Sequence, residues 1–420
     1  MIYLKKFSFP GGNDAWKASI SIFLISRFII LVCTYMAWSR FVVNGAVYGN
    51  ETHECLIHLH LCLQSWNQFD AKYFVGIARY GYGGYNDYTG YSPQHPYAVA
   101  FFPLYPLLIR GTGMLFGGSY AADYIGSLLV ANLCFFFALI FIYCLVRNDF
   151  DSSVARRSLF FLAFNPFAVF FFLGYSESLF LLLCVATLFL LRRGNALDWW
   201  LAGLCGAGAI LTRGSGIVLL LVFSITFLQR FGSILRAWFG RKLSIFKEGY
   251  WREMLNVLLP MSLIPLALAC YMFYLWSHWH DPLLFSHGEE HLWGRRLTLP
   301  WIGSTMAVYD LLFTTTGRDA RNLTDLIFTI GPLAIIILGW KRLPLNYIVF
   351  SLAIAVFSLT YPWPGHALAS APRFLLVMFP VGVMLALWSK RPMVEKMFEM
   401  LWVTFFVINT LLFVLWNWVG

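Results

Sequence analysis

Long apolar segments separated by short polar turns run through the whole chain. An α-helix needs about 20 consecutive apolar residues to cross a bilayer. The pattern therefore predicts an all-α polytopic membrane protein, with one integral membrane domain over residues 1–420 and about eleven transmembrane helices. The expected spans are 17–40, 121–146, 155–173, 178–192, 198–213, 215–230, 254–277, 323–340, 344–361, 371–389 and 399–418.

Two polar stretches between the spans are long, residues 41–120 and 278–322. With the N-terminus inside and the C-terminus outside, both stretches lie outside, and most Lys and Arg residues fall on the inner side, as the positive-inside bias requires. The first stretch contains an apolar segment, 98–109, with Pro103 and Pro106. A span there would reverse every later loop and spoil the charge bias. We therefore expect amphipathic or re-entrant helices there, on the outer face.

The composition supports a multi-pass membrane protein and excludes a soluble one. The chain is 60% hydrophobic and 12% charged, against about 45–50% and about 25% in soluble domains. Its formal net charge of +10 indicates basic inner loops, because no basic patch is interleaved with base-stacking aromatics as in a nucleic-acid-binding protein. We expect an integral protein of a bacterial plasma membrane or, in a eukaryote, of the ER membrane, with the first span as an uncleaved anchor.

The polar chemistry of the chain gathers on the outer side of this topology. All nine histidines lie on outer segments. A channel or transporter more often carries ionisable groups near the membrane centre; here Arg27 is the main candidate for that depth, and we expect it to face protein or to reach the interface. The other candidate residues lie in outer loops or at outer ends of spans: Asp70, Glu177, Arg213, Asp281 and Arg373.

The sharpest motif lies in the first outer segment, around Asp70. Trp66 and Phe69 precede this carboxylate, and an amphipathic helix is predicted to follow it over 71–80. A carboxylate at such a boundary is a candidate general base. An aspartate there is equally well placed to cap the helix by accepting backbone N–H bonds, and both roles are open.

Five blocks, in order over about residues 20–385, resemble the PIG-V family, which comprises GPI mannosyltransferase 2 and its prokaryotic relatives among the GT-C membrane glycosyltransferases. They are aromatic-Asp-Ala-x-aromatic-aromatic at 69–74 with Ile-Ala-x-x-Gly-Tyr at 77–82 and Phe-Phe-Pro-Leu-Tyr-Pro at 101–106; Asn-Pro at 165–166 with Tyr-Ser-Glu-Ser at 175–178; Thr-Arg-Gly-Ser-Gly at 212–216; Asp-Pro-Leu at 281–283 with Trp-Gly-Arg at 293–295; and Pro-Arg-Phe at 372–374.

The resemblance implies a GT-C-like helical bundle with an outer or lumenal active site. It also implies a sugar donor linked to a lipid phosphate, in family terms dolichyl- or polyprenyl-phosphate mannose, and a general base at Asp70. The pair after this base, Lys72-Tyr73, departs from the family pattern and could change what the helix contacts. The two long outer segments contain no Asp-x-Asp pair, so neither a metal nor another cofactor is suggested at the outer site.

The expected reaction assigns a role to each remaining candidate. Arg213 and Arg373 would bind the leaving phosphate, since a guanidinium can bind phosphate bidentately; the alternative is contact with lipid headgroups. Glu177 could bind a sugar or hold an arginine. The substrate-binding set is completed by Tyr175, Asp281 and Lys72.

Two outer clusters allow further alternatives. Cys55 and Cys62 flank His58 and His60, so a disulfide, free thiols or a zinc site are all compatible with the spacing. The histidines in 278–291 could bind a metal or simply form hydrogen bonds.

The predicted function is therefore a membrane glycosyltransferase, most simply a mannosyltransferase. Its partners would be a polyprenyl- or dolichyl-phosphate sugar, a lipid-linked glycan acceptor and membrane lipids, with no nucleic acid. The rival classes are a transporter or flippase of lipid-linked sugars and a non-catalytic membrane scaffold.

Overall fold

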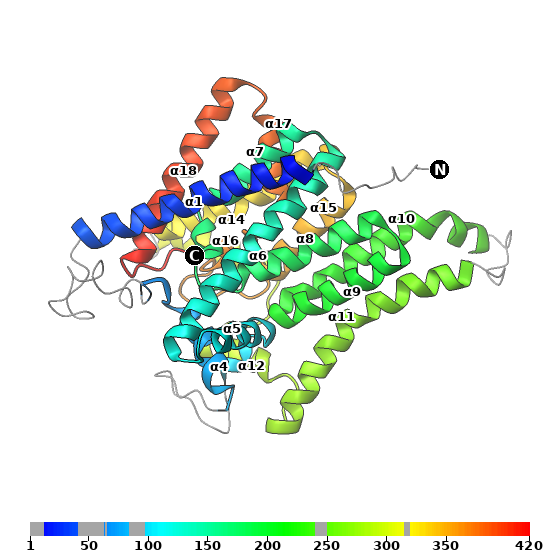
Figure 1. Cartoon of the computed structure of the whole chain (residues 1–420), viewed down its shortest axis with the longest axis horizontal. Coiled ribbons are helices and arrows are strands. Elements are labelled where there is room, and N and C mark those ends of the chain that lie inside the picture. The colour runs from blue at the N-terminus through cyan, green and yellow to red at the C-terminus, as the bar shows by residue number, and fades with distance from the viewer. Residues whose placement is uncertain (1–11, 41–62, 64, 84–96, 240–249, 315–319) are drawn as a thin grey trace.

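The computed structural model describes residues 12–40, 63, 65–83, 97–239, 250–314 and 320–420. Within these residues helices are the only regular secondary structure (Figure 1), which confirms the all-α prediction. The α-helices are α1 Gly12–Arg40, α4 Asp70–Tyr80, α5 Leu104–Leu115, α6 Tyr120–Asp149, α7 Ser152–Ala163, α8 Glu177–Arg193, α9 Ala196–Thr212, α10 Leu219–Phe239, α11 Tyr250–Trp279, α12 Leu284–Trp293, α13 Pro300–Phe313, α14 Ala320–Gly339, α15 Leu345–Leu359, α16 Ala371–Leu375, α17 Pro380–Trp388 and α18 Pro392–Val414. The 3-10 turns are η1 Tyr97–Ala100, η2 Ala168–Phe171, η3 Gly214–Val218 and η4 Trp340–Arg342.

The chain is an integral, multi-pass membrane protein. Six of its described helical segments are long and apolar enough to cross a membrane, namely α1, α6, η3 with α10, α11, α14 and α18. This number is below the eleven expected spans. Expected spans 178–192, 198–213 and 344–361 correspond to α8, α9 and α15, which have 17, 17 and 15 residues. The remaining difference comes from two expected spans that are not single helices.

The spans expected at 155–173 and 371–389 are each broken, and this corrects the prediction. In the first, α7 ends at Ala163 and the chain turns at Asn165 and Pro166 before η2 and α8. In the second, α16 ends at Leu375 and α17 begins at Pro380. Proline lacks the backbone N–H that a helix interior needs, so apolar composition alone overestimates the helix length at both places.

Arg27 forms hydrogen bonds at the first of these breaks, between α7 and α8. Its Nη2 donates to the carbonyl oxygen of Phe171 at 2.8 Å, and its Nε donates to Asn132 Oδ1 at 2.8 Å. Asn132 in turn donates to the carbonyl oxygen of Phe172 at 2.9 Å. Irregular backbone at membrane depth persists only where protein groups satisfy its hydrogen bonds. Arg27 thus faces protein, as one of the two expected alternatives states, and it stabilises the break.

We predict that Arg27→Leu destabilises the protein strongly. The change removes the hydrogen bonds that the charged Arg27 donates to Asn132, Ser26 and the carbonyl oxygen of Phe171, each worth about 1.5–3 kcal/mol. The Phe171 carbonyl is then left with the Ser178 hydroxyl as its side-chain donor. Thermal unfolding of the purified protein in detergent measures the loss, with Lys17→Leu on the exposed face of α1 as the matched control. Equal melting temperatures for the two variants would contradict this role for Arg27.

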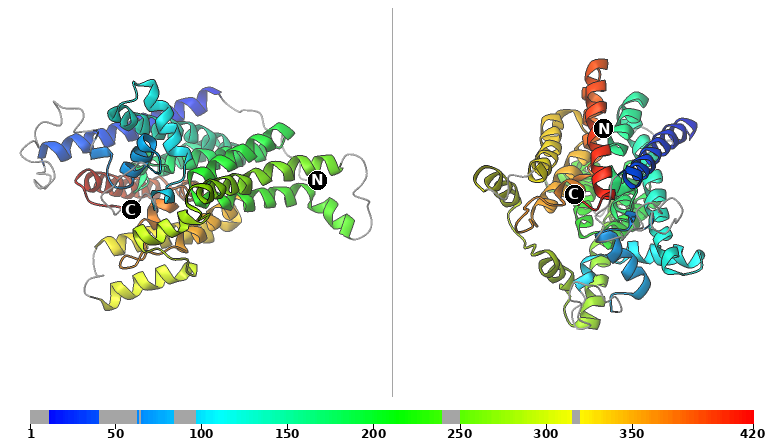
Figure 2. Two further views of the ribbon diagram at one scale, coloured as in Figure 1. Left: turned by 90° about the horizontal axis from the view of Figure 1, so that it is seen from below. Right: turned by 90° about the vertical axis from the view of Figure 1, so that its left-hand side faces the viewer.

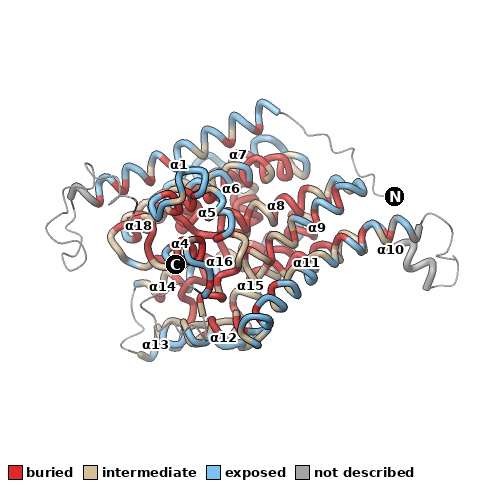
Figure 3. Tube along the Cα trace, turned by 60° about the horizontal axis from the view of Figure 1, so that its bottom comes forward, coloured by how far each residue is buried: buried red, intermediate tan, exposed pale blue. Residues whose placement is uncertain are grey.

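The core lies around α8, as Figure 3 shows by the buried residues at the centre of the molecule. This helix packs against α6 and α9. Large apolar side chains remain exposed on the outward faces of α1, α11 and α13, for example Phe28, Phe273 and Phe313. Figure 2 shows that α1 and α13 lie at the periphery of the bundle. Such apolar outer faces suit contact with lipid tails.

The two outer segments pack against each other beside the bundle, where Figure 1 shows α4, α5 and α12 together. The apolar stretch 98–109 is not a span, as expected: it is divided between η1 and α5. The Tyr97 ring stacks on the His291 ring at 3.7 Å between centroids. Gly288 lies so close that a Cβ there would be 2.7 Å from the carbonyl oxygen of Tyr97. The first and second outer segments therefore form one wall.

Candidate functional site

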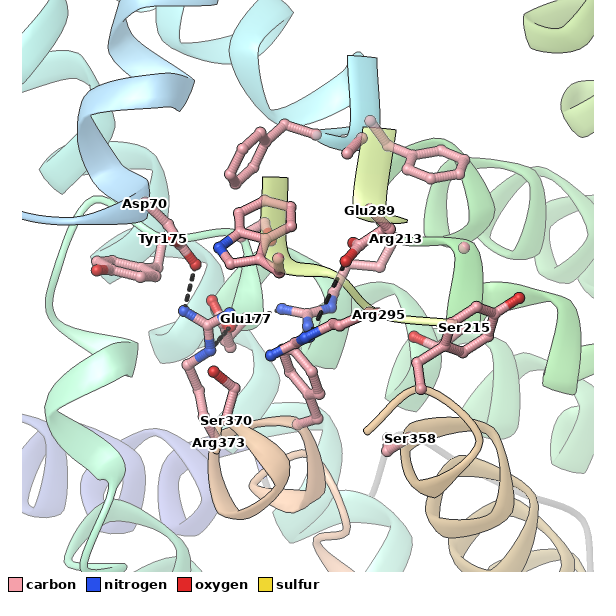
Figure 4. A pocket seen from close by; sticks show the side chains of 18 of the residues that line it. Asp70, Tyr175, Glu177, Arg213, Ser215, Glu289, Arg295, Ser358, Ser370 and Arg373 are labelled. Carbon is pink, nitrogen blue, oxygen red and sulfur yellow. Dashed lines mark hydrogen bonds and ion pairs between the residues drawn. The ribbon is translucent and has the colours of Figure 1, made fainter. Parts of the chain in front are cut away.

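A cavity of about 390 Å³ lies where the expected outer ends of the helices meet. It is bounded by the start of α4, the start of α8, the end of α9, helix α12, the start of α14, the end of α15 and helix α16. Its polar lining includes Asp70, Tyr175, Ser176, Glu177, Thr212, Arg213, Ser215, Ser286, Glu289, Arg295, Arg321, Ser358, Ser370 and Arg373. The structure therefore brings most of the predicted site residues into one chamber (Figure 4).

Four of these side chains form a continuous chain of ion pairs. Arg373 Nη1 donates to Asp70 Oδ2 at 2.6 Å, and Arg373 Nε lies 3.3 Å from Glu177 Oε1. The same oxygen of Glu177 accepts from Arg213 Nη1 at 2.6 Å. Figure 4 shows Arg373 reaching toward Asp70 from the opposite wall. Each charge is compensated by a neighbour, which is what burial of charged groups requires.

Asp70 does not cap helix α4. The helix begins at Asp70 itself, the capping position is Phe69, and no side chain makes a capping hydrogen bond there. Phe69 has a φ of 51°, a strained conformation for a bulky residue. Its ring is held against Phe413 and Trp418 at centroid distances of 5.6 and 5.0 Å. The packed ring thus fixes a backbone conformation that directs Asp70 toward Arg373.

Arginines crowd around one aromatic ring at the base of the cavity. The guanidinium carbons of Arg213, Arg295 and Arg373 lie 4.7, 5.3 and 4.9 Å from the centroid of the Phe374 ring. A ring face attracts cations and so offsets part of their mutual repulsion. Among the described residues, Arg295 Nε and Arg321 Nε and Nη2 are buried without a hydrogen-bond partner. Each of these two arginines has an acid nearby but beyond hydrogen-bond distance: Arg321 Nε lies 3.9 Å from Asp325 Oδ2, and Arg295 Nη1 lies 4.0 Å from Glu289 Oε2. The N–H groups can therefore still form hydrogen bonds to an anion.

Glu177 and Tyr175 organise the wall formed by the start of α8. Glu177 is buried and forms ion pairs with both Arg213 and Arg373. Of the two expected roles, binding a sugar or holding an arginine, the structure shows the second. The hydroxyl of Tyr175 donates to the carbonyl oxygen of Gln68 at 3.0 Å. This bond ties the start of α8 to the loop that carries Asp70. Both residues also line the cavity.

Asp281 and Lys72 lie apart from the cavity lining, in contrast to the prediction that they contact substrate. Asp281 Oδ1 accepts the N–H of Leu283 at 2.9 Å, and its Oδ2 pairs with His287 Nδ1 at 2.6 Å. Lys72 lies over the Trp416 ring at 4.8 Å, and partial burial lowers the pKa of its ammonium group. Two residues apart on a helix do not share a face, so Lys72 points away from the side that Asp70 occupies.

Sequence reasoning missed three charged residues of the cavity, Glu289, Arg295 and Arg321. A signal for Glu289 was present in the sequence. Phe285, Glu289 and Trp293 recur every four residues, so they share one face of α12, and all three line the cavity. Arg295 follows directly within the Trp-Gly-Arg block, whereas nothing in the local pattern marks Arg321.

The remaining predictions concern clusters in the outer segments. Cys55 and Cys62 fall outside the described residues, together with His58 and His60. In the described part of the chain, no group of three or more His, Cys, Asp and Glu side chains is arranged to hold a metal ion. His278 Nδ1 lies 2.9 Å from the carbonyl oxygen of Tyr274, so it takes part in a local hydrogen bond.

Burial raises the pKa of the Glu289 carboxyl above its ordinary value of 4.5, although the Arg295 guanidinium opposes the shift. A group with a raised pKa contributes stability that is complete below its ordinary pKa and is lost as pH rises through the raised value. We predict that the melting temperature of Glu289→Gln, whose side chain stays neutral, equals that of the wild type near pH 4.5. As the pH rises, the melting temperature of the variant exceeds that of the wild type by a growing margin.

Thermal unfolding in detergent across this pH range measures the effect. Glu290→Gln on the exposed face of the same helix gives the background. A melting-temperature difference between Glu289→Gln and the wild type that stays flat, or that falls with rising pH, would show that burial does not disfavour the ionised carboxylate.

Comparison with known proteins gives one family and several solved structures. Residues 94–243 match the profile of a family described as dolichyl-phosphate-mannose-protein mannosyltransferase. The match covers less than half of the chain and includes the start of α8 and the end of α9, which bound the cavity. No curated protein matches the chain. The resemblance to the PIG-V family stays a prediction.

Two membrane proteins of known structure are similar in arrangement at low sequence identity. One is the oligosaccharyltransferase AglB from Archaeoglobus fulgidus, in complex with an inhibitory peptide and a dolichol-phosphate, at 12% identity and a TM-score of 0.46. The other is ArnT from Cupriavidus metallidurans in the apo state, at 16% identity and a TM-score of 0.47. These alignments cover 94% and 82% of this chain, but 55% and 61% of those proteins.

Proposed function

We propose that this protein is a membrane glycosyltransferase that moves a sugar, most simply mannose, from a polyprenyl- or dolichyl-phosphate donor to a lipid-linked acceptor at the outer or lumenal face. The observation that carries the proposal is the cavity in which Asp70 shares one chamber with four arginines. A carboxylate and a group of guanidinium donors are the parts that sugar transfer from a phosphate requires. The mannosyltransferase family match over 94–243 supports the same class.

The reaction is a single displacement at the anomeric carbon of the donor. The acceptor hydroxyl oxygen forms a bond to this carbon, the bond to the phosphate oxygen breaks, and the lipid phosphate leaves with the electron pair. Asp70 accepts the proton of the hydroxyl. Its Oδ2 is held by Arg373, while its Oδ1 accepts no hydrogen bond from the described part of the chain. Oδ1 is therefore the oxygen proposed to act as the base.

The leaving phosphate is assigned to the arginine side of the cavity. Arg213 and Arg373 are fixed by Glu177, and a guanidinium carries five N–H donors, so each retains donors beyond those ion pairs. Arg295 and Arg321 add buried N–H groups that lack a hydrogen-bond partner among the described residues. Donors fixed before the reaction stabilise the charge that develops on the phosphate without reorganising.

We predict that Asp70→Asn loses turnover while it keeps the fold and binds donor. Asparagine retains an oxygen for Arg373 but cannot accept the proton, and removal of a general base costs about 100- to 10,000-fold in rate. Transfer from polyprenyl-phosphate mannose to a lipid acceptor measures turnover, and binding of the same donor is measured in parallel. The exposed Asp14→Asn on α1 is the control. Near-normal turnover in Asp70→Asn would refute the base assignment.

A second prediction concerns Arg213. Arg213→Lys keeps the positive charge and the attraction to Glu177, but a point charge cannot reproduce the planar fork. Loss of even one charge-assisted hydrogen bond to phosphate weakens binding of polyprenyl phosphate by about tenfold or more. The matched control is Arg230→Lys. Arg230 donates a hydrogen bond to the carbonyl oxygen of Gly194 and does not line the cavity. If Arg213→Lys bound polyprenyl phosphate like the wild type, Arg213 would not contact the phosphate.

A further inference from the structure

The three acids that line the cavity are not equivalent. Asp70 and Glu177 are each engaged by an arginine at 2.6 Å. The carboxylate of Glu289 accepts no side-chain hydrogen bond within the described part of the chain, and its nearest cation, Arg295 Nη1, is 4.0 Å away. About a third of its side chain remains exposed, at 34%, and it lines the cavity. Glu289 thus has acceptor capacity that the protein itself does not use.

The side chains around Glu289 are aromatic. Phe285 and Trp293 lie one turn before and one turn after it on the same face of α12, and both line the cavity. Phe101 packs edge-on against Trp293 at a centroid distance of 5.6 Å. An aromatic face beside a carboxylate offers an apolar surface for C–H groups and acceptors for hydroxyl groups. A sugar ring carries both kinds of group on one rigid frame.

The backbone that carries this pair is held firmly. Gly288 fits against the carbonyl oxygen of Tyr97 with no room for a side chain, and the rings of Tyr97 and His291 are stacked. The helix ends at Trp293, and its C-cap residue, Gly294, is in the left-handed conformation with a φ of 65°. A helix that is held by close contacts at Gly288 and His291 and ended by a defined cap can orient a ligand without the cost of ordering a loop.

We propose that Glu289 and Trp293 form the subsite for the sugar of the donor, in which the Glu289 carboxylate binds ring hydroxyls and Trp293 lies against the ring. The inference rests on the proposed function and deepens it by assigning the recognition of the sugar. Figure 4 shows Glu289 across the cavity from Asp70, with arginines between them.

The positions of the other groups favour the donor sugar over the other ligands. The acceptor hydroxyl must lie beside Asp70, and the phosphate must lie beside the arginines. A carboxylate would repel the phosphate, and Asp70 takes the reacting end of the acceptor, so we assign the hydroxyls of the donor sugar to Glu289. Burial raises the pKa of the Glu289 carboxyl, and either form suits this role: the ionised form accepts hydrogen bonds from hydroxyl groups, and the protonated form can also donate one.

The test compares two lipids that differ only in the sugar. Binding of polyprenyl-phosphate mannose and of bare polyprenyl phosphate is measured on the purified full-length protein. Glu289→Ala is expected to weaken binding of the mannose lipid by about 10- to 100-fold, the size expected for lost hydrogen bonds to a charged group. Binding of bare polyprenyl phosphate stays within about twofold of the wild type, and this also shows that the variant is folded.

Two further variants sharpen the result. Trp293→Ala is likewise expected to weaken the binding of polyprenyl-phosphate mannose without weakening the binding of bare polyprenyl phosphate. Glu290→Ala removes the neighbouring acid on the exposed face, which pairs with Arg296 at 2.7 Å, and is expected to leave both affinities unchanged. Glu289→Gln retains hydrogen-bonding groups and is expected to lose less mannose-lipid affinity than Glu289→Ala.

The outcomes separate the two proposals. The sugar subsite would be refuted, while the proposed function stood, if Glu289→Ala weakened the binding of both lipids equally or left both affinities unchanged. The same holds if the variant raised only the KM for the acceptor. If the wild type bound neither lipid, the proposed function would fail and the subsite with it.

Discussion

The buried guanidinium of Arg373 is the interaction on which the site depends. It joins Asp70 of the first outer segment to Glu177 at the start of α8. The rings of Phe170, Tyr175, Phe374 and Trp418 lie 4.9–5.4 Å from it. A charge removed from water in this way is tolerable only when it is paired and hydrogen-bonded. The arrangement therefore fixes three segments of the chain and fixes the direction of the Asp70 carboxylate.

The site exists because helices stop inside the protein. Breaks before α8, after α9 and around α16 direct backbone and charged side chains into one chamber, and a bundle of uninterrupted spans would instead present apolar surface there. Such breaks expose polar backbone groups at membrane depth, where each needs a partner. Arg27 and Asn132 supply partners on one side of the α7–α8 break, and Asn409 donates to the carbonyl oxygen of Pro166 on the other. Residues far from the cavity thus stabilise its geometry.

Much of this architecture could be predicted from the sequence, because hydropathy and the bias of basic residues determine which helix ends share a face. That reasoning placed Asp70, Glu177, Arg213 and Arg373 together without any contact information. Side-chain direction was harder to predict. Asp70 does not cap α4 because the helix begins one residue earlier than expected, at Asp70 itself. Asp281 does not line the cavity, and its carboxylate pairs locally with His287. Arg321 could not be found at all, since only tertiary packing brings it to the cavity.

The ion pair between Asp70 and Arg373 joins residues that are 303 positions apart. At synthesis rates of about 5–20 residues per second, Arg373 emerges from the ribosome roughly 15–60 s after Asp70. During that interval the carboxylate is already made while its partner does not yet exist. The cavity is consequently among the last features of the molecule to form, after most of the helices have been made, and a chain still in synthesis has no assembled site with which to engage a lipid substrate.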